Sequence, residues 1–254
     1  MIVTLIARNT FREATRDRVL AGVVVAGVVV ILATQLLNTL ALGEGRRLTI
    51  DLGLTAISVF GLLIVLLVGT NLVAKEIERR TIFNLLARPI SRPAYLLGKW
   101  LGLSGALWAV AGSLGLALCA VLAVRGDGAM GLVVLQAAYL AALEMTVITA
   151  LAVLFSALST PVLSALYTLG CYVVGQWSWD LRDFARQFPA ALGTAVEVVA
   201  NLVPNLPVFN MRALAAHGEP TTIYHLALAT LYALVYSGCV LALASAAFES
   251  RDFK

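Results

Sequence analysis

Long apolar runs alternate with short polar stretches along this chain, and the runs have the length of membrane-crossing helices. A helix rises about 1.5 Å per residue and therefore needs about 20 residues to cross a hydrocarbon core of about 30 Å. Five runs reach this length and a sixth comes close: residues 19–42, 52–74, 95–124, 129–158, 162–179 and 223–248. The pattern predicts an all-α polytopic membrane protein with six transmembrane helices.

The fifth run, residues 162–179, is the shortest and ends in Trp177 and Trp179. Tryptophan is enriched where the membrane meets water, so we expect this pair at a headgroup boundary. Residues 180–222 separate this run from the last; they keep helical apolar spacing in their first half and contain four prolines. We expect them to form an outer segment of short helices on the membrane surface.

The first 18 residues are short and carry charges at a helical spacing. Arg8, Arg12 and Arg16 recur every four residues on one face, with apolar residues on the opposite face. This pattern predicts a helix in the membrane interface with its arginines toward anionic headgroups. A solvated tail is the alternative.

The longest polar interruption in the first half is the basic segment 75–94. Residues 76–88 have helix-forming composition, and Pro89 and Pro93 end the pattern. We predict a short amphipathic helix beneath the membrane.

The orientation follows from the distribution of basic residues. Six spans place both termini on the same side of the membrane as segment 75–94. That side of the membrane then holds 12 of the 18 Lys and Arg residues. That bias predicts cytoplasmic termini.

Composition agrees with a membrane protein. The 254 residues are 61% hydrophobic and 13% charged, and the mean hydropathy is +0.93, which excludes an ordinary soluble domain. The net charge of +4 is divided among loops and does not indicate nucleic-acid binding. Cys119, Cys171 and Cys239 all lie in apolar runs without paired spacing, so we interpret them as packing residues.

No motif for catalysis, metal binding or cofactor binding is present in the sequence. The Gly98-Lys99 pair does not fit a phosphate-binding loop, because Pro93 stands where the first glycine belongs and Trp100 where a hydroxyl belongs. If the protein uses ATP, we expect another chain to bind the nucleotide and its Mg²⁺.

Glu144 is the one acidic residue deep in an apolar run, with Gln136 two turns earlier. A charged residue at the bilayer centre costs about 2.5–3.5 kcal/mol on insertion scales, so we expect it to face the protein interior or to be protonated. It could contact substrate or act in gating, or it could hydrogen-bond a polar group such as Asn71 or Ser58. The intramembrane polar candidates are therefore Glu144, Gln136 and Asn71.

The run from Glu76 to Arg92, followed by Gly98-Lys99, resembles the cytoplasmic segment between spans two and three of type-2 ABC exporter permeases. Phe155 to Ser159, Pro204 to Leu206 and Phe248 to Phe253 extend the resemblance over most of the chain. It implies a coupling helix that docks on a separate ATP-binding subunit. The residues implied in coupling are Glu76, Glu78, Arg79, Arg80, Thr81, Ile82, Phe83, Leu85, Leu86, Arg88 and Pro89.

The resemblance further implies two ATP-binding subunits, a second permease subunit of the same or a similar chain, and the inner (plasma) membrane of a bacterium. The outer segment would then cap the translocation path or meet an extracytoplasmic partner. Two other classes remain open from the residues: an ion- or proton-coupled carrier that uses Glu144, and a membrane scaffold. The apolar spans fit a hydrophobic or amphipathic cargo without identifying it.

Overall fold

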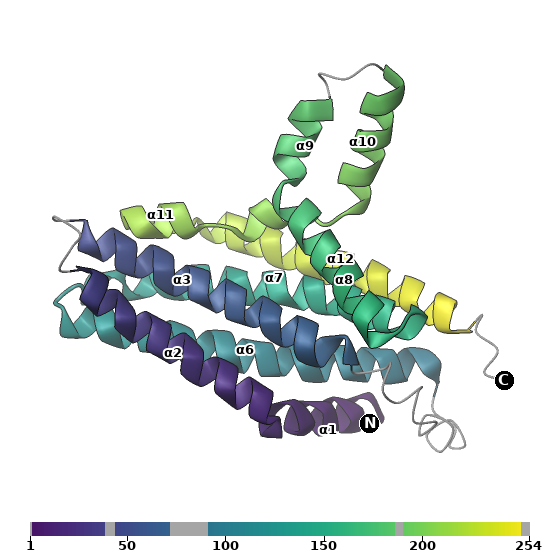
Figure 1. Cartoon of the computed structure of the whole chain (residues 1–254), viewed down its shortest axis with the longest axis horizontal. Coiled ribbons are helices and arrows are strands. Elements are labelled where there is room, and N and C mark those ends of the chain that lie inside the picture. Colours follow the sequence, from purple (N-terminus) through teal and green to yellow (C-terminus); the bar gives the residue numbers. More distant parts are fainter. Residues whose placement is uncertain (1, 39–43, 72–90, 186–189, 250–254) are drawn as a thin grey trace.

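A computed structural model of the chain describes residues 2–38, 44–71, 91–185 and 190–249. These residues form helices joined by turns, and no strand occurs among them. The long helices lie side by side in one bundle (Figure 1) and are α2 (Arg18–Asn38), α3 (Gly45–Ile64), α6 (Arg92–Val124), α7 (Gly131–Leu158) and α12 (Ile223–Glu249). The shorter ones are α1 (Ile2–Arg16), α8 (Pro161–Gln176), α9 (Ser178–Ala185), α10 (Ala190–Leu202) and α11 (Arg212–His217).

Three short turns complete the path: η1 (Val65–Gly69) is a π-helical continuation of α3, and η2 (Gly128–Met130) and η3 (Leu206–Phe209) are 3-10 turns. We call the end of the bundle where both termini lie the proximal end, and the opposite end the distal end (Figure 1). Helices α6 and α8 start at the proximal end, and each has a proline in its first turn. Proline is tolerated there because the missing N–H would have no partner within the helix.

Five segments of the described residues are long and apolar enough to cross a membrane: Arg18–Leu36, Gly45–Gly69, Arg92–Val124, Gly128–Leu158 and Ile223–Phe248. They correspond to five of the six predicted spans. The all-α polytopic membrane fold is therefore confirmed. The remaining prediction, a span at residues 162–179, falls on α8, which has 16 residues.

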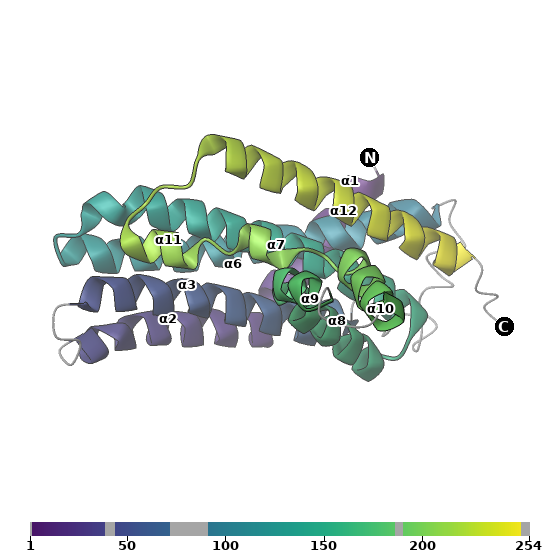
Figure 2. The same cartoon turned by 90° about the horizontal axis from the view of Figure 1, so that it is seen from above.

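Helix α7 is the centre of the bundle. Its apolar window is 89% buried within the chain, against 28% for α2 and for α12. Helices α3, α6, α8 and α12 all contact it, and Figure 2 shows α6 and α7 between the α2–α3 pair and α12. The low burial of α2 and α12 leaves most of their apolar surface for lipid or for another chain.

Helix α8 runs from the proximal end only to the level of the middle of α7. Its last residue, Gln176, donates a hydrogen bond to Glu144, which is the fourteenth residue of the 28-residue α7. Trp177 and Trp179 follow directly, so they lie near mid-bundle and not at the end of the bundle where a headgroup boundary was expected. Within the outer segment, η3 and α11 pack along α7 and α3 toward the distal end.

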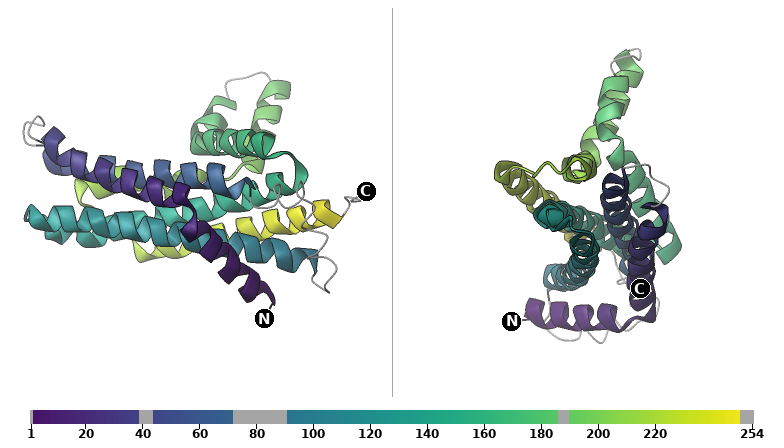
Figure 3. Two further views of the ribbon diagram at one scale, coloured as in Figure 1. Left: turned by 60° about the horizontal axis from the view of Figure 1, so that its bottom comes forward. Right: turned by 90° about the vertical axis from the view of Figure 1, so that its left-hand side faces the viewer.

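The pair of helices α9 and α10 stands away from the bundle (Figure 1, and Figure 3, right). The chain leaves at Gln176 and returns at Asn205, whose Oδ1 accepts a hydrogen bond of 2.9 Å from Ser178 Oγ. This pair is therefore an excursion between α8 and η3.

Candidate functional site

Glu144 is buried in the centre of the bundle, with 1% of its surface exposed. Helix α7 places it there because α7 is packed on nearly all sides. A carboxylate in such a place needs charged or hydrogen-bonding partners, since burying an unpaired charge is costly.

The partners of Glu144 come from both sides of the α9–α10 excursion. Gln176 Nε2, at the end of α8, donates to Glu144 Oε1. Arg212, the first residue of α11, acts on the carboxylate electrostatically from a longer range. Tyr172, one turn before Gln176, interacts with the side chains of Gln176 and Arg212. We call Glu144, Tyr172, Gln176 and Arg212 the central polar cluster.

This cluster links α7, α8 and α11 at the level where the chain leaves the bundle and re-enters it. Chemically it is an acceptor carboxylate, an amide donor, a phenol and a guanidinium inside an apolar bundle. Such a group can orient the re-entering segment, because the positive charge of Arg212 is favoured close to the carboxylate.

The other predicted intramembrane candidates have different partners. Asn71 is not next to Glu144: its Nδ2 donates to Leu67 O over 2.6 Å at the proximal end. Gln136 Oε1 accepts a hydrogen bond of 2.9 Å from the backbone N–H of Thr221, just before α12. The expected hydrogen bond of Glu144 to Asn71 or Ser58 is therefore corrected to one from Gln176.

Tyr172, Gln176 and Arg212 were not among the residues predicted from the sequence. Arg212 falls in the segment 180–222 that the sequence predicts on the outer side, and Gln176 falls in the predicted span 162–179. One feature of the sequence points to Arg212. A buried carboxylate such as Glu144 requires a compensating donor, and Arg212 follows a short proline-containing segment that can turn back into the bundle.

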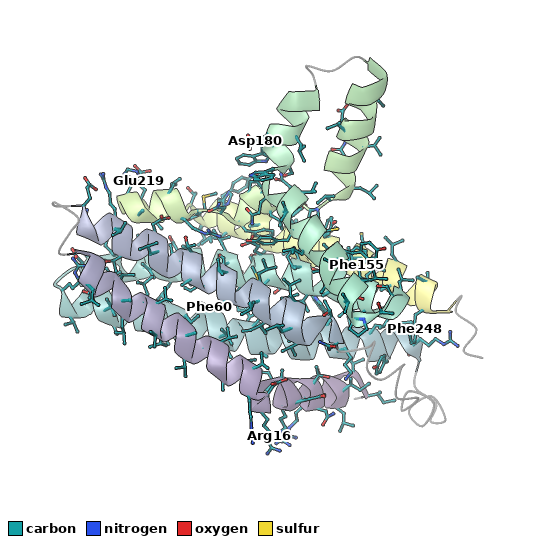
Figure 4. All side chains as sticks on the ribbon, viewed as in Figure 1. Arg16, Phe60, Phe155, Asp180, Glu219 and Phe248 are labelled. Atoms are coloured by element: carbon teal, nitrogen blue, oxygen red, sulfur yellow. The ribbon has the colours of Figure 1, made fainter. Side chains whose placement is uncertain are left out.

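The proximal end holds both flanks of the predicted coupling segment. Before it, the carbonyl of Thr70 accepts a hydrogen bond of 2.8 Å from Ser156 Oγ of α7. Toward its C-terminal edge, at the first residue of α6, Arg92 Nη1 donates to the carbonyl of Phe248 over 2.7 Å, and its guanidinium lies 5.8 Å from the centroid of the Phe248 ring. Figure 4 shows Phe248 near the proximal end of α12. The two flanks are thus tied to α7 and to α12.

The predicted coupling residues themselves, Glu76 to Pro89, lie outside the described residues. The same holds for residues 72–75 and Ile90. The site that can be described is the frame around this segment.

Helix α1 belongs to that frame. It crosses the proximal part of α6 (Figure 3), and a Cβ added at Gly102 would lie 2.5 Å from the carbonyl oxygen of Ala7. Only glycine permits this close approach of the two backbones. Lys99 is buried beside the contact, with its Nζ 3.9 Å from Glu13 Oε2 and 5.9 Å from the centroid of the Tyr95 ring.

Part of the apolar face of α1 therefore packs on α6, with Thr10 and Ala14 buried, while Ile2 and Leu5 stay exposed. Arg8, Arg12 and Arg16 are exposed on the opposite face. Figure 4 shows Arg16 projecting away from the bundle. The arginines are available to headgroups or to another chain, as the interfacial prediction requires.

The cysteines Cys119, Cys171 and Cys239 are free thiols. Within the described ranges, no group of three or more His, Cys, Asp or Glu residues is placed to hold a metal ion.

Comparison with known proteins places the chain by family. The family described as ABC-2 family transporter protein matches residues 4–252, which is nearly the whole chain. No curated protein matches it.

Proposed function

Because the chain belongs to the ABC-2 transporter family and is a membrane permease of an ABC transporter, we propose that it couples ATP hydrolysis in a separate subunit to export of its cargo. In this proposal the ATP-binding subunit holds ATP and Mg²⁺, and the segment 75–94 docks on it. The assignment of export rests on the resemblance of residues 76–92 to exporter permeases.

The frame at the proximal end is the observation that carries this proposal. A force applied to residues 72–90 reaches α7 through the Thr70–Ser156 hydrogen bond and α12 through the contacts of Arg92 with Phe248. It reaches α1 through the close packing of α6 on α1 at Gly102. Movement of one short segment can thus shift several helices together between two arrangements, as two-state domain motions require.

A second permease chain is part of the proposal, and the α9–α10 pair supports it. The pair leaves the bundle at the level of Glu144, yet Asp180 and Glu197 on it are exposed; Figure 4 shows Asp180 on the projecting part. An aspartate facing lipid at mid-membrane costs about 2.5–3.5 kcal/mol. Protein or water must therefore cover these carboxylates, and we assign this role to a second copy of the chain and to the path between the copies.

The test is a mild-detergent purification of the tagged chain from its own host, followed by mass spectrometry and an Mg²⁺-dependent ATPase assay. We expect a co-purifying subunit with a phosphate-binding loop of the GxxxxGK[ST] type. Phe83→Glu combined with Leu85→Glu should remove that subunit and the ATPase activity together.

Leu5→Glu is the matched control, because it places the same charge on an apolar side chain that is 73% exposed on α1. This variant should keep the ATPase subunit. Equal retention of the subunit by the Phe83/Leu85 variant and by the control would contradict the docking role of the segment.

A further inference from the structure

Helix α12 diverges from α7 toward the distal end (Figure 2), and a laterally open groove of about 440 Å³ lies between them. This volume falls within the range of about 300–1,000 Å³ that is usual for ligand sites. The groove is lined by residues of both helices: Leu135, Gln136, Tyr139, Leu226, Ala227 and Thr230.

The hydroxyls of Tyr139 and Thr230 and the side-chain carbonyl oxygen of Gln136 have partners within the chain. The hydroxyls of Tyr139 and Thr230 are 2.7 Å apart and hydrogen-bond each other. Gln136 Oε1 accepts from the N–H of Thr221. The groove therefore offers apolar side chains to an occupant, with Leu135, Leu226 and Ala227 on its walls, and it gives a polar ligand little to bind.

The groove lies at the depth of lipid acyl chains. Tyr139 is eight residues from the start of α7 at Gly131, which corresponds to about 12 Å along the helix. Both helices qualify as membrane spans, so the open side of the groove faces the hydrocarbon of the distal leaflet.

The shape of the groove selects among apolar occupants. A helix is about 10–12 Å across and would have to pack on the irregular wall as a rigid body. An unbranched hydrocarbon chain is narrower, adapts to an irregular wall and has no polar group to satisfy. We propose that the groove between α7 and α12 binds one acyl chain of a membrane phospholipid.

This site is distinct from the central polar cluster and from the coupling frame. It requires neither ATP nor a bound ATPase subunit, so its test can fail without bearing on the proposed function. The acyl chain fills the space that opens between α7 and α12 beside the Tyr139–Thr230 hydrogen bond, which holds the two helices together there.

The test uses the full chain in vesicles of phosphatidylcholine that include a phosphatidylcholine with a diazirine in its acyl tail. After illumination, tandem mass spectrometry locates the labelled residues. We expect label on Leu135, Leu226 and Ala227, saturating with probe concentration. Ala227→Trp, which fills the groove from α12, should lower this labelling about tenfold.

Leu135→Trp fills the groove from α7 and should lower the labelling in the same way. Agreement between the two variants excludes an effect caused by misfolding of only one of them. Leu228→Trp is the matched control, since Leu228 is next in sequence to Ala227 but lies outside the groove lining. It should leave the labelling of groove residues unchanged, and all three variants should give a single symmetric peak on size exclusion.

Two results would overturn the proposal. Equal and unsaturable labelling of groove residues and of Leu228 and Leu231 would indicate ordinary contact with bulk lipid. Covalent dimers formed from a photo-crosslinking amino acid at position 227, with no lipid adducts, would show that a second copy covers the groove.

Discussion

At the scale of single residues, Glu144 decides how three parts of the chain meet. It is fully surrounded in α7, and Gln176, Tyr172 and Arg212 reach it or its neighbours from α8 and α11. Removing one partner of a buried charge is costly because the other is left uncompensated. The stability of the central polar cluster should therefore depend on its members jointly.

We expect Glu144→Gln and Arg212→Gln to be non-additive in a double-mutant cycle. The coupling free energy should be about 0.5–3 kcal/mol, toward the lower part of that range because Arg212 acts from a longer range and is partly exposed. The measurement is the free energy of unfolding in detergent, with tryptophan fluorescence as the signal that monitors unfolding.

Arg125 supplies the comparison for this cycle. Its Nη1 donates to Thr49 Oγ1 over 2.8 Å at the distal end, away from Glu144. Glu144→Gln and Arg125→Gln should therefore be additive within experimental error. A coupling with Arg125 as large as that with Arg212 would refute a specific role for Arg212.

At the scale of elements, α1 is attached to the bundle by backbone proximity and not by a large side-chain core. The Gly102 position allows α1 to lie against α6, and Lys99 and Glu13 lie beside this contact. Overpacking at such a contact costs about 1–3 kcal/mol. A single methyl group at Gly102 should therefore displace α1.

The test is labelling of Ala14→Cys by a maleimide in a chain from which the three native cysteines have been removed. Ala14 is 2% exposed, so the introduced thiol should react slowly. Gly102→Ala should make it react faster. Gly112→Ala on the same helix is the control, because a Cβ there meets no atom within 4 Å and should leave the reaction slow.

At the scale of the whole molecule, the position of the α9–α10 pair leads to an assembly prediction. A photo-crosslinking amino acid in place of Trp179, which is 54% exposed, should yield covalent dimers in native membranes. The same amino acid in place of Leu36, which is 76% exposed on α2, should yield far fewer. Equal dimer yields at the two positions, or none at Trp179, would contradict a second copy at this surface.

The membrane fold and its main helices follow from the sequence alone. Apolar runs of membrane-spanning length can be recognised locally, because each helix satisfies its own backbone hydrogen bonds and requires only apolar side chains. The predicted spans 19–42, 52–74 and 129–158 fall on the helical segments Arg18–Leu36, Gly45–Gly69 and Gly128–Leu158, and the second of these begins seven residues earlier than expected. The family follows in the same way, since the order of short motifs is a property of the sequence.

Tertiary structure decided what surrounds each apolar or charged side chain. Sequence spacing gave α1 an apolar face, but could not tell whether lipid or α6 covers it, since both are apolar. The run ending at Trp179 looked like a full span, yet α8 stops beside Glu144 because Gln176 and the returning segment supply partners there. Interactions between residues far apart in the chain, such as the hydrogen bond from Gln176 to Glu144, depend on how the helices are packed, and local patterns carry no record of that packing.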